Sequence, residues 1–242
     1  MNVEQIRELL TSLAVLNQQG EIPVQAYCML VGNHSPELLA DQLHQRWLSD
    51  EKFVNIAANI VLHIHKADKK NMALPSATLA LLLNDYRNRL EVRSKSAQMF
   101  RNSVRTLFDM YPIYEKIDEY VCQCFIKPMF KSLDMLIDNN PEPQDIETMA
   151  VLLTRHGKRL NELNSFWIDN LITKIRAKLC SDDPAISSDL RRILLHVHDL
   201  WSFGWNELLI PEILTTNYTE ETPSELPIQR KREEQKTEFF KP

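Results

Sequence analysis

The sequence predicts an all-α protein, and three observations carry this prediction. Apolar residues recur at steps of three and four along most of the chain, which is the period of one face of an α-helix. The 242 residues include only four glycines and no alternating Val/Ile/Thr runs, so neither β-sheets nor glycine-rich phosphate loops are expected. The twelve prolines stand mostly between the helical segments, where they separate one helix from the next.

Residues 145–205 show the pattern most clearly, as three consecutive amphipathic helices. Their apolar faces are Met149, Leu152, Leu153, His156, Leu160 and Leu163, then Ile168, Leu171, Ile172, Ile175 and Leu179, and finally Leu190, Ile193, Leu194, Val197 and Trp201. A helix cannot bury such a face by itself. Each of the three therefore needs its neighbours, which favours a stack of helical repeats.

The N-terminal part of the chain predicts four further helices, over residues 3–19, 23–31, 36–49 and 52–66. Ser35-Pro36-Glu37 is a helix start signal. The serine side chain accepts hydrogen bonds from first-turn amides, proline has a suitable φ, and glutamate favours the positive end of the helix. Residues 68–74 are expected to form a polar loop.

Prolines define the expected helices in the middle of the chain. Pro75 would begin a helix whose buried face consists of Leu79, Leu82, Leu83, Tyr86 and Leu90. The next helix would bury Phe100, Val104, Leu107, Phe108 and Tyr111, and Pro112 is expected to end it. Pro128 is expected to kink or divide the stretch 113–138, because proline lacks a backbone donor. Asp182-Asp183-Pro184 would cap the last helix.

Helix pairs would begin near Pro36, Pro75, Ile113 and Ser165, at spacings of roughly 40–50 residues, close to the repeat length of HEAT-type arrays. The sequence therefore predicts a HEAT-type domain over residues 1–214. Residues 215–242 are polar and carry mixed charges, so a flexible C-terminal tail is expected. Phe239 and Phe240 form a candidate linear motif within that tail.

Composition restricts the compartment and the class of partner. The net charge of -5 and pI near 5.8 predict no bulk attraction to nucleic acid. The four cysteines lack disulfide-framework or zinc spacing, which favours a reducing compartment. The first nineteen residues include Glu4, Arg7 and Glu8, unlike a secretory signal, and no apolar run reaches about 18 residues. The expected location is cytoplasmic or nuclear, away from membranes.

The sequence contains no constellation typical of a catalytic or metal site. His63/His65, His196/His198 and Cys122/Cys124 are two residues apart, which places the side chains about 200° apart on a helix. Nucleotide-binding loops and the nucleophile elbow of hydrolases are absent. His156 is expected to be a partly buried, hydrogen-bonded histidine. We therefore expect no enzyme activity, no cofactor and no metal.

Basic residues are the candidate partner-binding residues. They form two groups: Arg87, Arg89, Arg93, Lys95, Arg101 and Arg105, and then Arg155, Lys158 and Arg159. Arg89/Arg93 and Arg101/Arg105 are i, i+4 pairs, so each pair would project from one helix face. They could bind an acidic protein surface or RNA phosphates. The alternative is that they are solvated residues that complement helix C-termini.

Several motifs also resemble one known family. Residues 81–86 (LLLNDY) with Leu90-Glu91, residues 101–110 (RNSVRTLFDM) and residues 148–163 are similar to helices of the middle domain of eukaryotic translation initiation factor 4-gamma. Asp199, Leu200 and Trp205 resemble the closing motif of that family. Trp201 stands where the family usually has a basic residue, which could change the surface contacts there. The resemblance covers residues 75–205, whereas residues 1–66 match only in helix rhythm.

The resemblance implies a right-handed superhelix of about five antiparallel helix pairs without catalysis of its own. The short chain is most similar to small single-domain members, such as the stem-loop-binding-protein interactor or the polyadenylate-binding-protein-interacting type. Implied partners are a DEAD-box RNA helicase of the initiation-factor 4A type, cap-bound machinery or another mRNP protein, and sometimes RNA or a second copy of the chain.

Three functional hypotheses follow. The first is an adaptor in mRNA translation or metabolism that links an mRNP protein to a helicase or cap-bound factor. The second is a protein that binds RNA directly. The third is an unrelated HEAT or armadillo scaffold in trafficking or ubiquitin pathways, because a fold alone does not fix a partner.

Overall fold

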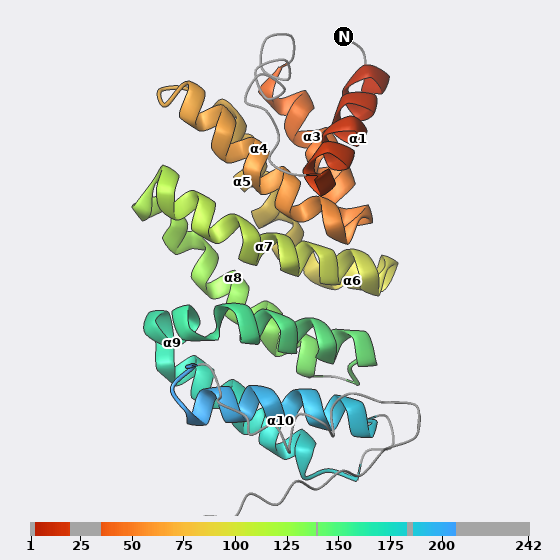
Figure 1. Ribbon diagram of the computed structural model, residues 1–242, viewed down its shortest axis with the longest axis vertical. Helices are drawn as coiled ribbons and strands as arrows, with labels where there is room; N and C mark the ends of the chain where they lie inside the picture. The colour runs from red at the N-terminus through yellow and green to blue at the C-terminus, as the bar shows by residue number, and fades with distance from the viewer. Residues whose placement is uncertain (1–2, 20–34, 139, 183–185, 207–242) are drawn as a thin grey trace, which may run out of the picture. The chain divides into compact units, whose positions relative to one another are not determined.

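The computed structural model describes residues 3–19, 35–138, 140–182 and 186–206, and every regular element within these ranges is helical (Figure 1). The elements are α1 (Val3–Gln19), α3 (Pro36–Ser49), the 3-10 helix η1 (Glu51–Phe53), α4 (Val54–Ala67), α5 (Ala73–Arg87), α6 (Arg89–Lys95), α7 (Ala97–Ile117), α8 (Glu119–Ile137), α9 (Pro143–Leu179) and α10 (Ser188–Ser202). The predicted all-α fold is confirmed. The predicted helix over residues 23–31 lies outside the described residues.

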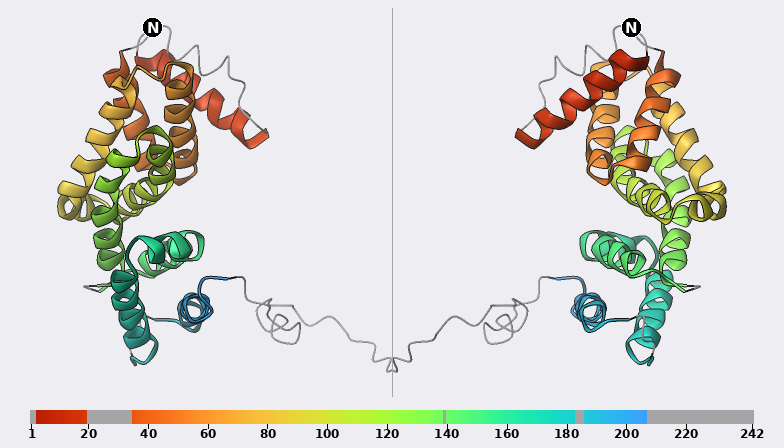
Figure 2. Two further views of the ribbon diagram at one scale, coloured as in Figure 1. Left: turned by 90° about the vertical axis from the view of Figure 1, so that its left-hand side faces the viewer. Right: turned by 90° about the vertical axis from the view of Figure 1, so that its right-hand side faces the viewer.

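Successive helices pack in the manner of a HEAT-type stack. Helix α3 contacts α5, and α4 contacts α7. The pair α3/α4 therefore packs against the next pair, α5–α6/α7, through both of its helices. Helix α8 contacts α7 and α9, and α10 contacts α9 (Figure 2). Within the described ranges this gives four pairs, α3/α4, α5–α6/α7, α8/first part of α9 and second part of α9/α10, while α1 lies against α3 and α4.

Contacts divide the chain into a unit Met1–Asn206 and a second unit Glu207–Pro242. The predicted domain end at residue 214 and the tail with its two phenylalanines fall in the second unit, outside the described residues. None of the helices that the structure describes is long and apolar enough to cross a membrane.

Side chains of serine and aspartate begin several helices. Ser35 accepts a hydrogen bond from the amide of Leu38, as predicted from the Ser-Pro-Glu signal, and Ser96 begins α7 in the same way. The predicted cap of the last helix is wrong. Helix α10 begins at Ser188, and Ser187 is its N-cap, accepting from the amide of Leu190. Asp183 and Pro184 lie outside the described residues.

Pro112 does not end its helix, contrary to prediction, and the expected division of residues 113–138 does not fall at Pro128. Pro112 lies inside α7 and Pro128 inside α8. The break comes instead at Asp118, whose backbone is extended and whose carboxylate accepts from the amides of Tyr120 and Val121. The buried neighbours of Pro112 offer a reason: Tyr111, Ile113 and Tyr114 remain in the core only if the helix continues, and their burial outweighs the lost backbone hydrogen bond.

Helix α9 is divided at Asn164, close to the predicted boundary between two helices. Asn164 has φ -163° and ψ 90°, and its side chain accepts from the amide of Trp167, as an N-cap does. The parts of α9 before and after Asn164 run in different directions (Figure 1). The helix begins at Pro143, two residues before the predicted start, with a capping box between Glu142 and Asp145.

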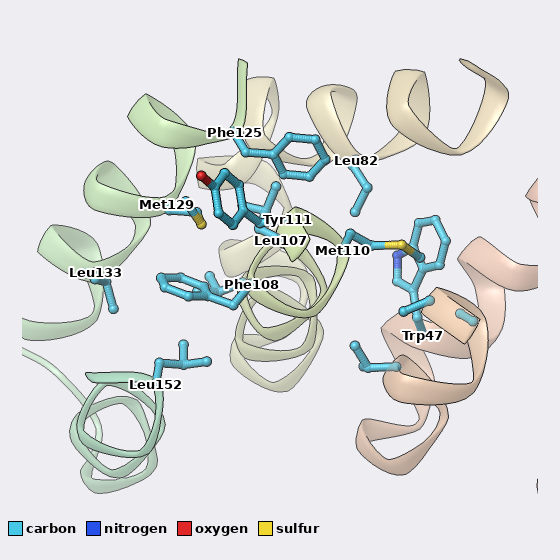
Figure 3. Close-up of a cluster of buried hydrophobic side chains, with 14 of the residues drawn as sticks. Trp47, Leu82, Leu107, Phe108, Met110, Tyr111, Phe125, Met129, Leu133 and Leu152 are labelled. Atoms are coloured by element: carbon cyan, nitrogen blue, oxygen red, sulfur yellow. The ribbon is translucent and has the colours of Figure 1, made fainter. Parts of the chain in front are cut away.

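Helix α7 supplies the centre of the core. Phe108 and Leu107 lie among Met129 and Leu133 of α8 and Leu152 of α9, while Met110 lies near Trp47 of α3 (Figure 3). Tyr114 joins α7 to α5, because its hydroxyl contacts Thr78 Oγ1 at 2.7 Å and donates to the Pro75 carbonyl at 2.5 Å. The predicted apolar stripe of α7 is therefore confirmed as its buried face.

The end of α10 packs back onto the first part of α9. Gly204, with φ 66°, turns the chain, and the Trp205 ring occupies the space where a Cβ of Gly157 would lie. Trp201 is partly buried, and its indole N–H donates to Asp169 at 3.1 Å. This tryptophan, which stands where the family usually has a basic residue, therefore makes a contact within the fold. Trp201 and Trp205 are packed against the core, whereas Phe203 between them is 66% exposed.

Candidate functional site

The buried carboxylate of Asp145 binds two of the predicted arginines. Arg93 on α6 donates to one oxygen of Asp145 at 2.8 Å, and Arg101 on α7 donates to the other at 2.9 Å. Arg101 also donates to Glu142 at 2.8 Å, and Arg93 donates to the Met135 carbonyl at 2.5 Å. These bonds tie α6 and α7 to the start of α9.

Arg101 belongs to the interior and is not part of an accessible surface. Its side chain is 7% exposed. Burial lowers the pKa of its guanidinium, but the hydrogen bonds to Glu142 and Asp145 outweigh this and raise the pKa above its ordinary value. Arg93 is 21% exposed, and its guanidinium also lies over the Phe100 ring at 5.4 Å. The structure therefore gives these two residues a structural role.

The remaining basic residues near α6 are held by local contacts. Arg89 donates to the Tyr86 carbonyl at 3.0 Å and lies over the Tyr86 ring at 4.5 Å, and Lys95 pairs with Glu91 at 2.7 Å. Arg87 is exposed at the end of α5. Leu90 is 72% exposed, contrary to its predicted place on a buried face, because α5 ends at Arg87 and α6 begins a new direction.

Charged residues of α7 and α9 form a continuous surface, which we call the α7–α9 face. It comprises Arg105, Asp109 and Glu115 on α7 and Arg155, Lys158 and Arg159 on α9. One ion pair joins the two helices, between Arg159 and Glu115. Arg105 pairs with Glu51 of η1 at 3.4 Å. Arg105 also donates to Thr148 at 2.9 Å.

Burial affects the ionisable groups in the middle of the α7–α9 face. Burial raises the pKa of the Asp109 carboxyl, and the charges of Arg155 and Arg105 oppose this shift. Burial lowers the pKa of Arg105. Side-chain hydrogen bonds to Glu162 and Glu115 raise the pKa of Arg159. This face therefore carries acidic and basic groups that influence one another.

Arg155 and Lys158 are the exposed positive charges of this face. Both are exposed, and neither has a carboxylate within 4 Å among the described residues. They are three residues apart on α9, which places them on neighbouring positions of one side of the helix. A partner could therefore reach both cations together without first breaking an internal ion pair.

His156 is partly buried, as predicted, but its hydrogen bonding differs from the prediction. Its ring contacts Phe108, with centroids 5.4 Å apart, and its Nε2 has no hydrogen-bond partner within the protein. Burial, together with the charge of Arg155, lowers the pKa of this imidazole. Across the parts of the chain that are described, no group of three or more His, Cys, Asp or Glu side chains is placed to hold a metal ion.

The nine predicted basic residues are thus not one surface. Arg87, Arg89 and Lys95 lie on α5 and α6, Arg93 and Arg101 hold the α6–α7–α9 junction, and Arg105, Arg155, Lys158 and Arg159 share the α7–α9 face. The acidic partners were missed because Glu115 and Asp145 are more than forty residues away from their arginines. Glu142-x-x-Asp145 was the one local signal, since it is a capping box.

Comparison with known proteins gives a distant match over most of the chain. No protein-family model matches. A Xenopus tropicalis protein named MIF4G domain-containing protein is 23% identical over 179 residues, which cover 72% of this chain and 79% of that protein. MIF4G domain-containing protein A of Xenopus laevis is 22% identical with the same coverage. The chain is MIF4G-like. This agrees with the resemblance to the middle domain of initiation factor 4-gamma, whereas neither match singles out a particular small member.

The distant relationship suggests a domain that interacts with proteins in translation or RNA metabolism. The α7–α9 face includes residues of two of the motifs that resemble the family, 101–110 and 148–163. The site that the geometry offers is a docking surface made of charged side chains on two neighbouring helices.

Proposed function

We propose that this protein is a non-catalytic adaptor in mRNA translation or metabolism. It would link an mRNP protein to a DEAD-box RNA helicase of the initiation-factor 4A type or to cap-bound initiation machinery, in the cytoplasm or nucleus. The family resemblance and the distant MIF4G relatives support this proposal. The helical stack supports it too, because such folds offer extended, rigid surfaces to protein partners.

The observation that carries the proposal is the charge pattern of the α7–α9 face. Arg155 and Lys158 are exposed and have no ion-pair partner among the described residues, while Glu115 and Asp109 lie on the neighbouring helix. A protein partner can place acidic side chains against the two cations and basic side chains near the carboxylates. Such complementary charges would attract the partner and fix its position on the surface. The α7–α9 face is therefore the proposed helicase-binding surface.

Direct RNA binding is less well supported than protein binding. Five of the nine predicted basic residues already have a carboxylate partner: Arg93, Lys95, Arg101, Arg105 and Arg159. Each such pair would have to open before the cation could neutralise a phosphate and release a counterion. A labelled single-stranded RNA should therefore not bind at physiological salt. Tight binding that weakens steeply as salt rises would favour the RNA hypothesis instead.

The main experiment compares capture of a purified initiation-type DEAD-box helicase by two variants of the full chain. Arg155→Glu/Lys158→Glu should weaken capture by about tenfold or more, because it removes both free cations and adds two repulsive charges. Lys69→Glu/Lys70→Glu makes the same change in net charge on the exposed loop between α4 and α5 and should bind as the wild type does.

Two results would count against the proposal. Equal capture by both double variants would remove the α7–α9 face as the contact surface. Failure of the wild-type chain to capture the helicase would reject this partner and leave the scaffold outside translation as the better hypothesis.

A further inference from the structure

A concave surface lies between the C-terminal half of α8 and the second part of α9. It is a groove of about 400 Å³ whose floor is formed by Phe130, Trp167 and Leu171. Lys131, Asp134 and Lys174 stand at its edge. A volume of this size falls within the range of side-chain and ligand pockets, about 300–1,000 Å³. No residue of the α7–α9 face lines it.

Aromatic side chains give the groove an apolar floor and an exposed wall. Phe130 is 4% exposed and meets Trp167 edge to face, with ring centroids 4.8 Å apart. Phe166 lies beside Trp167 in sequence and is 69% exposed. The break at Asn164 causes this arrangement, because the helix restarts there and carries both aromatics in its first turn. Aromatic residues in such positions are typical anchoring points of interfaces.

Both lysines and aspartates stand at the edge of the groove. Lys174 pairs with Asp134 at 3.0 Å and with Asp138 at 2.6 Å, and Lys131 also pairs with Asp134, at 3.4 Å. Around the groove three lysines therefore stand against two aspartates, and the two lysines on α8 are the exposed Lys131 and Lys127. They are four residues apart and so occupy one side of the helix. An acidic group bound along that side would meet two cations.

We propose that this groove binds a short segment of a partner protein that carries one bulky apolar side chain close to an acidic residue. The apolar side chain would cover Trp167 and Phe166, and the acid would pair with Lys131 and Lys127.

This site goes beyond the proposed helicase contact, because it assigns a second docking surface, on α8 and the second part of α9. An adaptor needs two such surfaces to hold two partners at once. The apolar-acidic segment would belong to the second partner, while the helicase would contact the α7–α9 face.

The test uses the full chain and a displayed library of random peptides as the probe. Peptides selected on the wild-type chain should share a bulky apolar residue with an acid nearby. Phe166→Ser and Lys131→Glu should each weaken binding of a selected peptide by about tenfold or more, the loss expected when an anchoring contact is removed. Both residues are exposed, so the variants should keep the helical circular-dichroism spectrum of the wild type.

Matched substitutions control for the chemistry of the changes. Phe203→Ser and Lys116→Glu alter exposed residues of α10's end and α7 and should bind the selected peptide as the wild type does. The proposal is overturned if no peptides are enriched, if the enriched peptides lack the apolar-acidic pattern, or if the groove variants bind them normally. Helicase capture, measured in parallel, should survive Phe166→Ser and Lys131→Glu. Its loss in both would show that the groove is not a separate site.

Discussion

Arg101 and Asp145 form a buried ion pair although 44 residues separate them in the chain. Their side chains are 7% and 0% exposed, and Arg93 occupies the second oxygen of the same carboxylate. One aspartate therefore pairs with two arginines from two helices, and the exposed Glu142 supplies a second carboxylate to Arg101. This arrangement holds the junction of α6, α7 and α9 behind the α7–α9 face.

Asp145→Ala should be among the most destabilising substitutions in the protein. It leaves Arg101 buried without its main counterion, and breaking a buried pair from one side costs about 3–5 kcal/mol. Urea unfolding followed by circular dichroism measures the change in free energy of unfolding. Glu147→Ala removes an exposed carboxylate of the same helix and serves as the control. A loss below about 1 kcal/mol, the size typical of exposed pairs, would mean that the pair contributes little.

Gly157→Ala should destabilise the protein although alanine favours helices. The added Cβ would overlap the Trp205 ring, and such overpacking costs about 1–3 kcal/mol. The same substitution in a Trp205→Ala background should instead be neutral or stabilise by up to about 1 kcal/mol, since only the helix propensity then changes. Thermal unfolding of the four proteins gives both values. Equal effects of Gly157→Ala in the two backgrounds would show that Trp205 is not packed there.

His156 should make the stability of the fold depend on pH. Its pKa in the folded protein is lowered below 6.5 by burial and Arg155, so the unfolded chain binds the proton more readily. The stability that the neutral imidazole contributes is present above pH 6.5 and is lost as the pH falls through the lowered pKa. Urea unfolding at pH 7.5 and in steps down to pH 5 should show this loss.

The comparison with His156→Gln isolates this histidine from the other six. The variant should lose less stability than the wild type between pH 7.5 and pH 5, because it has no imidazole to protonate at that position. His196→Gln replaces an exposed histidine of α10 and should retain the wild-type decline. Identical pH profiles for wild type and His156→Gln would contradict the prediction.

The local sequence was sufficient to predict most helices but not the effect of their prolines. Ser35 and the apolar stripe of α7 act through neighbours within one or two turns, and both predictions are confirmed. Pro112 was expected to end a helix because proline cannot donate the local backbone hydrogen bond of a helix. Its helix continues since Tyr111 and Tyr114 on either side are buried against other helices, and that gain is not visible in a short window of sequence.

The candidate surface was predicted only in part for a related reason. The sequence shows where basic residues cluster along the chain, and Arg155 and Lys158 are indeed exposed. It does not show which acid from a distant segment will meet each base. Arg101 and Arg105 are one turn apart on the same helix, yet only Arg101 is buried, because it pairs with Asp145. The groove beside Phe166 was not predicted either, because its floor comes from two helices.

The sequence by itself determined an all-α chain, the approximate limits of its helices and which face of each is apolar. These features depend on helix period, capping and backbone preferences, which act over a few residues. The tertiary structure alone decided that Arg101 is structural, that Arg155 and Lys158 have no ion pair within the described residues, and that Phe166 stands beside a groove. Burial and ion pairing depend on distances between residues far apart in the chain, and packing sets those distances.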